Sequence, residues 1–179
     1  AKYEAPKVIC STNTFNHIGD LHSFVKGVDT LLADDGYFVL ELPWAKDLVE
    51  GNEFDTVYHE HTSEFSILSL VKLCEFFDMH VVDITRLDVH GGSMRVFMRR
   101  KAMGDTPTPI VKQMLDEEMS IGMLDKATYD AFTNRVHAVR DELLGLLGDF
   151  KAQGLKIAGY AAPAKGNTLL NYFGIGPET

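Results

Sequence analysis

The sequence predicts an α/β fold built on a parallel sheet, and two apolar runs with an amphipathic helix between them carry that prediction. The runs "KVICSTNT" (7–14) and "YFVLELP" (37–43) are prone to form strands and nearly continuous in apolar residues. The segment between them repeats apolar residues at helical spacing, with Asp20 as a predicted N-cap and Gly36 as a stop. A strand, a helix and a strand with short joints are typical of a βαβ unit, whose parallel sheet is covered by helices.

The rest of the chain predicts further helices and strands. Ser66 is a predicted cap for an amphipathic helix, and "MHVVDITRLDV" and "SMRVFMRR" read as two strands joined through "HGG". Residues 107–150 predict two helices with a break near 120–126. The segment "LKIAGYAAPAKGNTLLNYFG" (155–174) predicts a short strand, a small-residue turn and a helix. We therefore expect a second α/β unit to begin after the long helices.

Composition and charge exclude several classes of protein. The 179 residues are 45% hydrophobic and 24% charged, which is ordinary for a globular chain. The net charge of −9 and the lack of a Lys/Arg stripe argue against binding to nucleic acid. Cys10 and Cys74 are predicted to be buried small hydrophobes, with no disulfide framework or CxxC site. Without a signal peptide or a long apolar run, we expect a cytoplasmic protein that does not bind a membrane.

Polar residues follow the first predicted strand. Asn13, Thr14, Asn16 and His17 lie where that strand ends. Open α/β sheets bind ligands outside the carboxyl ends of their strands, so this loop is a candidate site. The alternative is a polar loop of caps and turns.

A second cluster occupies "YHEHTSE", residues 58–64. A histidine oriented by a carboxylate and placed beside a tyrosine makes a general base with a hydrogen-bond donor for an oxyanion. A metal site is an alternative, either through His59 and His61, which would share one face of an extended strand, or through His61 with Glu64. The two histidines still need a third ligand, such as His17. A solvated loop is the other alternative.

Two further segments carry weaker signals. In "RLDVHGGSMRVFMRR", Gly91 and Gly92 allow a tight turn, and Arg86 and Arg95 could face either an anionic ligand or solvent. In "GYAAPAKGNTLLNY", small residues before a helix suit a phosphate bound by backbone N–H groups, although no Walker or GxGxxG motif is present.

The blocks "NTFNHI", "FDTVYHEHTSEFS", "RLDVHGGSMRVF" and "GYAAPAKGNTLLNYFGIG" occur together and in this order. In this the chain resembles the sugar C-methyltransferases of deoxysugar biosynthesis over nearly its whole length. The resemblance implies S-adenosylmethionine as methyl donor and a nucleotide-linked 4-keto-6-deoxyhexose as substrate, methylated at C3. It places His61 at the proposed base, Tyr58 and Glu60 at companion active-site positions, and His17 at another implicated histidine.

The resemblance also implies further binding residues. Lys165 and Asn167 fall in the family's C-terminal domain, where we expect them to contact the nucleotide or stabilise the domain. Asn13, at the exit of the first strand, is a further substrate-binding candidate. No residue is assigned to S-adenosylmethionine, and no metal ligand is assigned in this chain.

The chain departs from the family pattern at its ends. The cysteine-rich zinc-binding segment, the glycine-rich S-adenosylmethionine loop and the acidic residue that holds the ribose are not in this sequence. We therefore expect the C-terminal half of a Rossmann-like class I methyltransferase sheet (1–65), followed by part of the C-methyltransferase C-terminal domain (66–179), and zinc only in an upstream segment. A half-sheet exposes an edge, which makes a homodimer one expectation.

The mechanism that follows has three parts. His61 would remove the proton next to the ketone, Glu60 or a neighbouring carboxylate would orient the imidazole, and Tyr58 or His17 would stabilise the enolate oxygen. Two other functions remain as alternatives. They are a non-catalytic module that binds a nucleotide or partner, and a metal-dependent hydrolase built on His17, His59 and His61.

Overall fold

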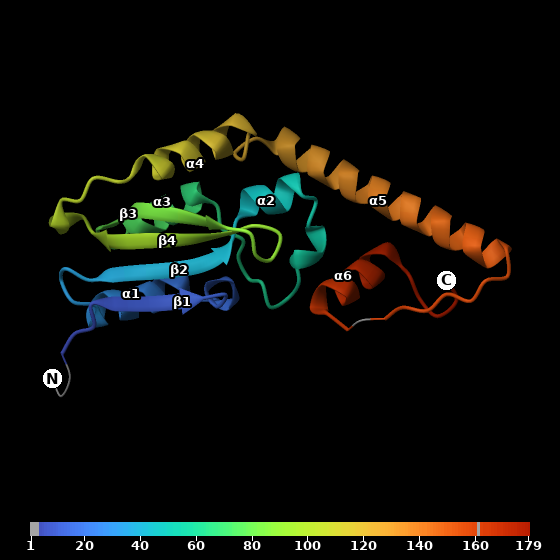
Figure 1. Cartoon of the computed structure of the whole chain (residues 1–179), viewed down its shortest axis with the longest axis horizontal. Helices are drawn as coiled ribbons and strands as arrows, with labels where there is room; N and C mark the ends of the chain where they lie inside the picture. The colour runs from blue at the N-terminus through green and yellow to red at the C-terminus, as the bar shows by residue number, and fades with distance from the viewer. Residues whose placement is uncertain (1–3, 161) are drawn as a thin grey trace.

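The computed structural model describes residues 4–160 and 162–179, and a mixed four-stranded sheet forms its centre (Figure 1). The strand order is β1-β2-β4-β3, in which β1 (Val8–Thr12) and β2 (Tyr37–Pro43) are parallel. β4 (Ser93–Arg100) is antiparallel both to β2 and to β3 (Met79–Leu87). The predicted βαβ unit is confirmed, with α1 (Leu21–Leu31) as its crossover helix.

Local capping signals fix where the helices next to the sheet begin. The Asp20 carboxylate accepts a hydrogen bond from Ser23 N at 2.9 Å and so caps α1 as predicted. Ser66 caps α3 (Ile67–Glu75) in a reciprocal capping box with Ser69. Side chains from α1, α3 and α4 (Pro109–Ser120) pack with one face of the sheet to form the main core.

The opposite face of the sheet is covered by no helix among the described residues. Val8 on β1 is 53% exposed, and Cys10 on the same strand is exposed. The prediction that Cys10 is buried is therefore wrong, because β1 is an edge strand and Cys10 shares the uncovered face with its partner Val39. Cys74 is buried, as predicted, in the core side of α3.

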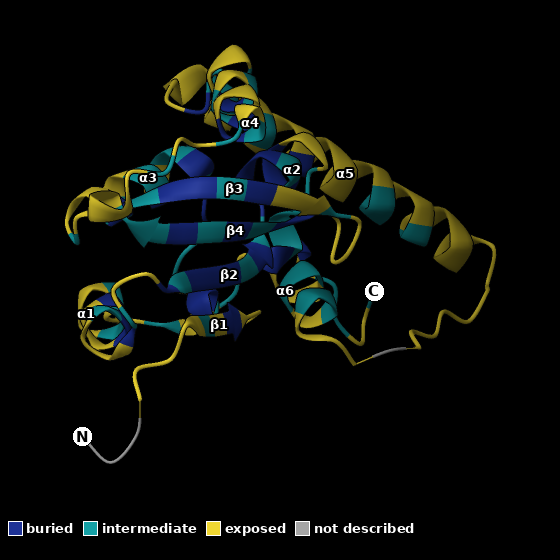
Figure 2. Cartoon of the chain, turned by 60° about the vertical axis from the view of Figure 1, so that its left-hand side comes forward, coloured by how far each residue is buried: buried dark blue, intermediate teal, exposed yellow. Residues whose placement is uncertain are grey.

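After β4 the described chain is mostly helical, and α5 reaches away from the sheet. α4 and α5 (Lys126–Ala152) confirm the two predicted helices and the break between them. Val136 is the buried residue of α5, and Figures 1 and 2 show the C-terminal half of this helix projecting with mostly exposed residues. None of the described helices is long and apolar enough to cross a membrane.

The predicted strand at 155–160 is wrong, because this exposed segment pairs with no other strand in the part of the chain that the structure describes. A strand forms only where a neighbour takes its backbone N–H and C=O groups. The helix predicted after it is confirmed as α6 (Ala164–Phe173). The division at 65/66 remains a prediction, and the sheet takes two strands from each side of it.

A buried carboxylate joins three of these elements. Glu118 of α4 is fully buried and accepts hydrogen bonds from Trp44 Nε1 at 2.5 Å, from Ile67 N at 2.6 Å and from Leu68 N at 2.9 Å. Ile67 and Leu68 open α3, so the charge also lies at the positive end of a helix dipole. The residue after β2, the start of α3 and the middle of α4 therefore meet at one side chain.

We expect Glu118→Ala to lower the free energy of unfolding by about 3 kcal/mol or more, because each of the buried N–H groups left without a partner costs about 1–3 kcal/mol. Urea unfolding followed by the fluorescence of Trp44, the one tryptophan in the sequence, measures this directly. Glu142→Ala, at an exposed position on α5, is the control and should change stability little. Equal midpoints for the two variants would contradict the role given to Glu118.

Candidate active site

The site loop, residues 51–66, connects α2 (Ala45–Glu50) to α3 and is fixed where it meets the end of β2. Trp44 and Phe65 form an isolated parallel bridge, and Ala45 N donates to Phe65 O at 2.9 Å. The segment formed by α2 and the site loop therefore leaves and returns at the same point beside the carboxyl end of β2. Its middle is free to reach across to the neighbouring strand exit.

Hydrogen bonds to Asn16 fix the middle of the site loop. Asn16 lies in the short 3₁₀ turn Phe15–His17 that follows β1. Its carbonyl accepts hydrogen bonds from Thr62 N at 2.9 Å, from Ser63 N at 3.3 Å and from Thr62 Oγ1 at 2.9 Å. As a result the loop after β1 and the site loop are joined, and the rings of His17 and His61 lie 5.0 Å apart.

A hydrogen-bonded chain runs through the cluster. Tyr58 Oη lies 3.0 Å from His61 Nε2, and His61 Nδ1 lies 3.2 Å from Glu64 Oε1. On the far side of Glu64, Asn16 Nδ2 lies 3.5 Å from Oε2. The side chains of His61 and Glu64 are only 12% and 19% exposed, so this chain is largely shielded from water.

Burial sets the protonation states of these groups. Desolvation raises the pKa of Glu64 to about 7, against the opposing charge of Lys165. Desolvation also lowers the pKa of His61, and the charge of His17 lowers it further. The pKa of Tyr58 is raised by burial and by the charges of Glu60 and Glu64, so its hydroxyl stays protonated. Near neutral pH the cluster therefore holds a neutral imidazole beside a phenol donor.

Three of the predicted catalytic residues come together and one does not. His17, Tyr58 and His61 are neighbours, with ring centroids of Tyr58 and His61 4.3 Å apart. The Glu60 side chain is 59% exposed, and its contact is with His59 Nε2 at 3.9 Å rather than with His61. Asn13, at the exit of β1, is exposed and has a left-handed backbone with φ of 49°.

Helix α6 brings the other predicted binding residues toward the site loop, as Figure 1 shows. The Phe54 ring stacks on Phe173 with centroids 5.0 Å apart. Lys165 Nζ lies 4.0 Å from Glu53 Oε2 at the edge of this contact. Asn167 is exposed, and its Oδ1 accepts a hydrogen bond from the side chain four residues along the helix.

Glu64 and Asn16 were not predicted as catalytic or substrate-binding residues, although Asn16 lies in the candidate loop after the first strand and Glu64 in the second cluster, and both complete the site. The spacing of three residues from His61 to Glu64 was a usable signal for the contact between them. No local pattern predicts the contact between Asn16 and Glu64, because it spans 48 positions.

The geometry does not support the metal-site alternative. The His59 side chain is 88% exposed, and within residues 4–160 and 162–179 no group of three His, Cys, Asp or Glu side chains is arranged to hold a metal ion. His17, His59 and His61 therefore do not form a shared coordination site.

The arginines flanking the "HGG" turn are already paired. Arg86 Nη2 contacts Asp47 Oδ2 at 2.9 Å, and Arg95 Nη2 contacts Glu41 Oε2 at 2.6 Å. Both guanidinium groups are therefore already neutralised by a carboxylate, and neither is positioned as an unpaired cation for an anionic ligand.

The "HGG" turn itself packs tightly against α2 and the site loop. Gly91 and Gly92 have φ of +85° and +132°, which other residues rarely adopt. A Cβ on Gly91 would lie 1.8 Å from Glu53 Oε1, and one on Gly92 would lie 2.2 Å from Asp47 Oδ2. Glycine is therefore required at both positions.

The fold and the cluster define a class: a mixed α/β domain with ionisable groups gathered at the carboxyl ends of parallel strands. Comparison of sequences identifies the family. The profile of the C-methyltransferase C-terminal domain family matches residues 88–179, and the chain belongs to this family. It is also 41% identical over 172 residues to the C-methyltransferase NovU of Streptomyces niveus. The match covers 96% of this chain and 41% of that protein, so the chain spans about two fifths of its relative's length.

The raised pKa of Glu64 predicts how stability varies with pH. Its ordinary value is 4.5 and burial raises the pKa to about 7, so the folded state binds more protons than the unfolded state between these values. Glu64 therefore makes the free energy of unfolding fall as the pH rises from about 4.5 to about 7. Replacing it by Gln removes this contribution. We expect urea unfolding at pH 5 and pH 8 to show that the free energy of unfolding of Glu64→Gln, relative to that of the wild type, is higher at pH 8 than at pH 5. An equal difference at the two pH values would contradict the prediction.

Proposed function

We propose that the chain provides the proton-transfer site of a sugar C-methyltransferase. The reaction is methylation of the carbon next to the ketone of a nucleotide-linked keto-deoxysugar, with S-adenosylmethionine as methyl donor. The observation that carries the proposal is the chain of contacts from Tyr58 through His61 to Glu64, with His17 against it. Membership of the C-methyltransferase C-terminal domain family supports the reaction class.

The chain offers only part of what S-adenosylmethionine requires. The exits of β1 and β2 suit a ligand that lies across the strand ends, but the sequence has no GxGxxG loop. We therefore assign no residue here to this co-substrate. Its contribution to the reaction is an electrophilic methyl group on a sulfonium.

His61 is the base in this proposal. Its lowered pKa keeps the imidazole neutral near pH 7, so a lone pair is ready to take a proton. In the free site Nε2 is hydrogen-bonded to Tyr58 Oη at 3.0 Å. When the ketone enters, the phenol would turn from Nε2 to the ketone oxygen, which exposes Nε2 to the adjacent C–H bond.

The proposed reaction consists of a proton transfer followed by a methyl transfer. The proton moves from carbon to His61 Nε2, and the electron pair of the C–H bond becomes the enolate. That carbon then forms a bond to the methyl group as the sulfur–methyl bond breaks, and the electrons of the broken bond remain on sulfur. A protonated His61 is left and returns its proton to solvent.

Tyr58 and His17 stabilise the charge that develops on the ketone oxygen. Their ring centroids lie 4.3 Å (Tyr58) and 5.0 Å (His17) from that of His61. The raised pKa of Tyr58 keeps its hydroxyl a hydrogen-bond donor. An oxygen placed between these donors would sit close to the carbon that His61 deprotonates.

Lys165 and Asn167 are proposed to contact the nucleotide part of the substrate. Lys165 is 40% exposed on α6, close enough to the site for its charge to affect the pKa of both Glu64 and His61. A cation at this distance suits a diphosphate that extends from a sugar bound at His61.

We expect His61→Ala to lower kcat for methyl transfer by about 10²–10⁴-fold, because this is the usual contribution of a general base. S-adenosylmethionine affinity should stay the same, since His61 does not contact it in this proposal. His59→Ala is the matched control, because His59 is two positions from His61 in the same loop and its side chain is 88% exposed. Wild-type turnover in His61→Ala would remove His61 from the role of base.

The second candidate function is a nucleotide-binding module without catalysis. Two observations favour it: Lys165 lies beside the site loop, and this sequence contains no GxGxxG motif. Titration calorimetry of this chain with thymidine diphosphate and with S-adenosylmethionine separates the two candidate functions. Binding of the nucleotide without S-adenosylmethionine would support the binding module for this chain.

We expect Lys165→Ala to weaken nucleotide binding about tenfold, because this corresponds to the loss of one charge-assisted hydrogen bond.

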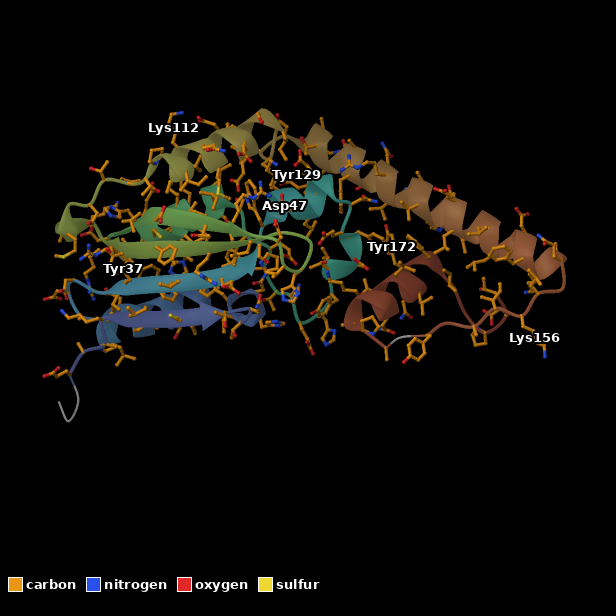
Figure 3. All side chains as sticks on the ribbon, viewed as in Figure 1. Tyr37, Asp47, Lys112, Tyr129, Lys156 and Tyr172 are labelled. Atoms are coloured by element: carbon orange, nitrogen blue, oxygen red, sulfur yellow. The ribbon has the colours of Figure 1, made fainter. Side chains whose placement is uncertain are left out.

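Lys156→Ala is the control for that titration. Figure 3 shows Lys156 on the return segment before α6, far from the sheet. Equal nucleotide affinities for Lys165→Ala and Lys156→Ala would contradict the role given to Lys165.

A further inference from the structure

We propose that Glu64 is a positioning residue for His61: it fixes the imidazole tautomer in which Nδ1 carries the proton and Nε2 is the accepting nitrogen. The inference rests on the proposed function, because it assigns a role to Glu64 in the site whose base is His61. It makes Glu64, and not Glu60, the carboxyl that orients this imidazole.

The direction of the hydrogen bonds follows from the atoms in contact. An ionised carboxylate has only acceptors, so His61 Nδ1, 3.2 Å from Glu64 Oε1, is the donor while Glu64 is ionised. A neutral imidazole has one N–H, so Nε2 carries the lone pair and Tyr58 Oη donates to it at 3.0 Å. The nitrogen that the reaction needs as a base is thereby the one that faces away from Glu64.

The Asn16 side chain can contact Glu64 in either charge state, so the tautomer of His61 can be the same in both. Its side chain is only 1% exposed, Nδ2 lies 3.5 Å from Glu64 Oε2, and its Oδ1 is buried with no hydrogen-bond partner. Turned over, the same amide would present Oδ1 to a protonated Oε2. With the proton on Oε2, Oε1 remains an acceptor for His61 Nδ1, so the tautomer is the same as with ionised Glu64.

Other charges around Glu64 modulate its ionisation without replacing it. Lys165 on α6 favours the carboxylate, and Glu53 in the site loop favours the acid. Both lie outside the hydrogen-bonded chain, and Glu60 points to His59. Among the described residues, Glu64 is the acidic side chain in hydrogen-bond contact with His61.

Heteronuclear NMR of the imidazole nitrogens tests the inference without any turnover. In the wild-type chain we expect His61 as the Nδ1–H tautomer. Glu64→Gln keeps the shape but offers Nδ1 both a donor and an acceptor, so the preference should be lost and the pKa of His61 should fall with the negative charge. Glu60→Ala is the comparison for the tautomer, which should match the wild type because Glu60 contacts His59 and not His61.

Activity gives the second readout. Glu64→Gln should lower kcat by about 10-fold to 10²-fold, less than loss of the base itself, with KM nearly unchanged. The Nδ1–H tautomer and an unchanged His61 pKa in both Glu64→Gln and Glu64→Ala would overturn the inference. That result is independent of the proposed function, which fails only if His61→Ala retains turnover.

Discussion

The buried carboxylate of Glu118 is the constraint on which the rest of the structure depends. It receives an indole N–H from Trp44 and two backbone N–H groups from the start of α3. Trp44 immediately precedes α2, and Ile67 immediately follows the site loop. A single charged side chain on α4, far along the chain, therefore fixes both ends of the segment formed by α2 and the site loop. A charge at this depth is tolerable only because all its partners are in place.

The site is assembled from two strand exits rather than from one motif. Thr62 attaches the site loop to the turn after β1 through the carbonyl of Asn16, and this attachment brings His17 against His61. The same Asn16 turns its side chain to Glu64. Backbone and side chain of one buried residue thus serve assembly and chemistry together, which explains why the cluster is compact although its members are far apart in sequence.

Features with a local cause could be predicted from the sequence, whereas those that depend on distant partners could not. Asp20 and Ser66 were identified as caps because a cap needs only the next turn of its own helix. The burial of Glu118 was not foreseen, since nothing near it in the sequence reveals the N–H groups that it meets. Cys10 looked buried because an apolar run does not reveal which face of its strand is covered. The family resemblance singled out His61, whereas its contact with Glu64 depends on how the site loop folds.

The "HGG" turn has a consequence for any attempt to alter specificity by directed evolution. Neither glycine can gain a side chain without displacing Glu53 or Asp47, and Glu53 also meets Lys165 on α6. Most variants in a library that randomised the turn would therefore have Glu53 or Asp47 displaced, and with them the contact to Lys165. Diversity is better placed at solvent-facing positions with an ordinary backbone, such as His59 in the site loop, whose side chain is 88% exposed.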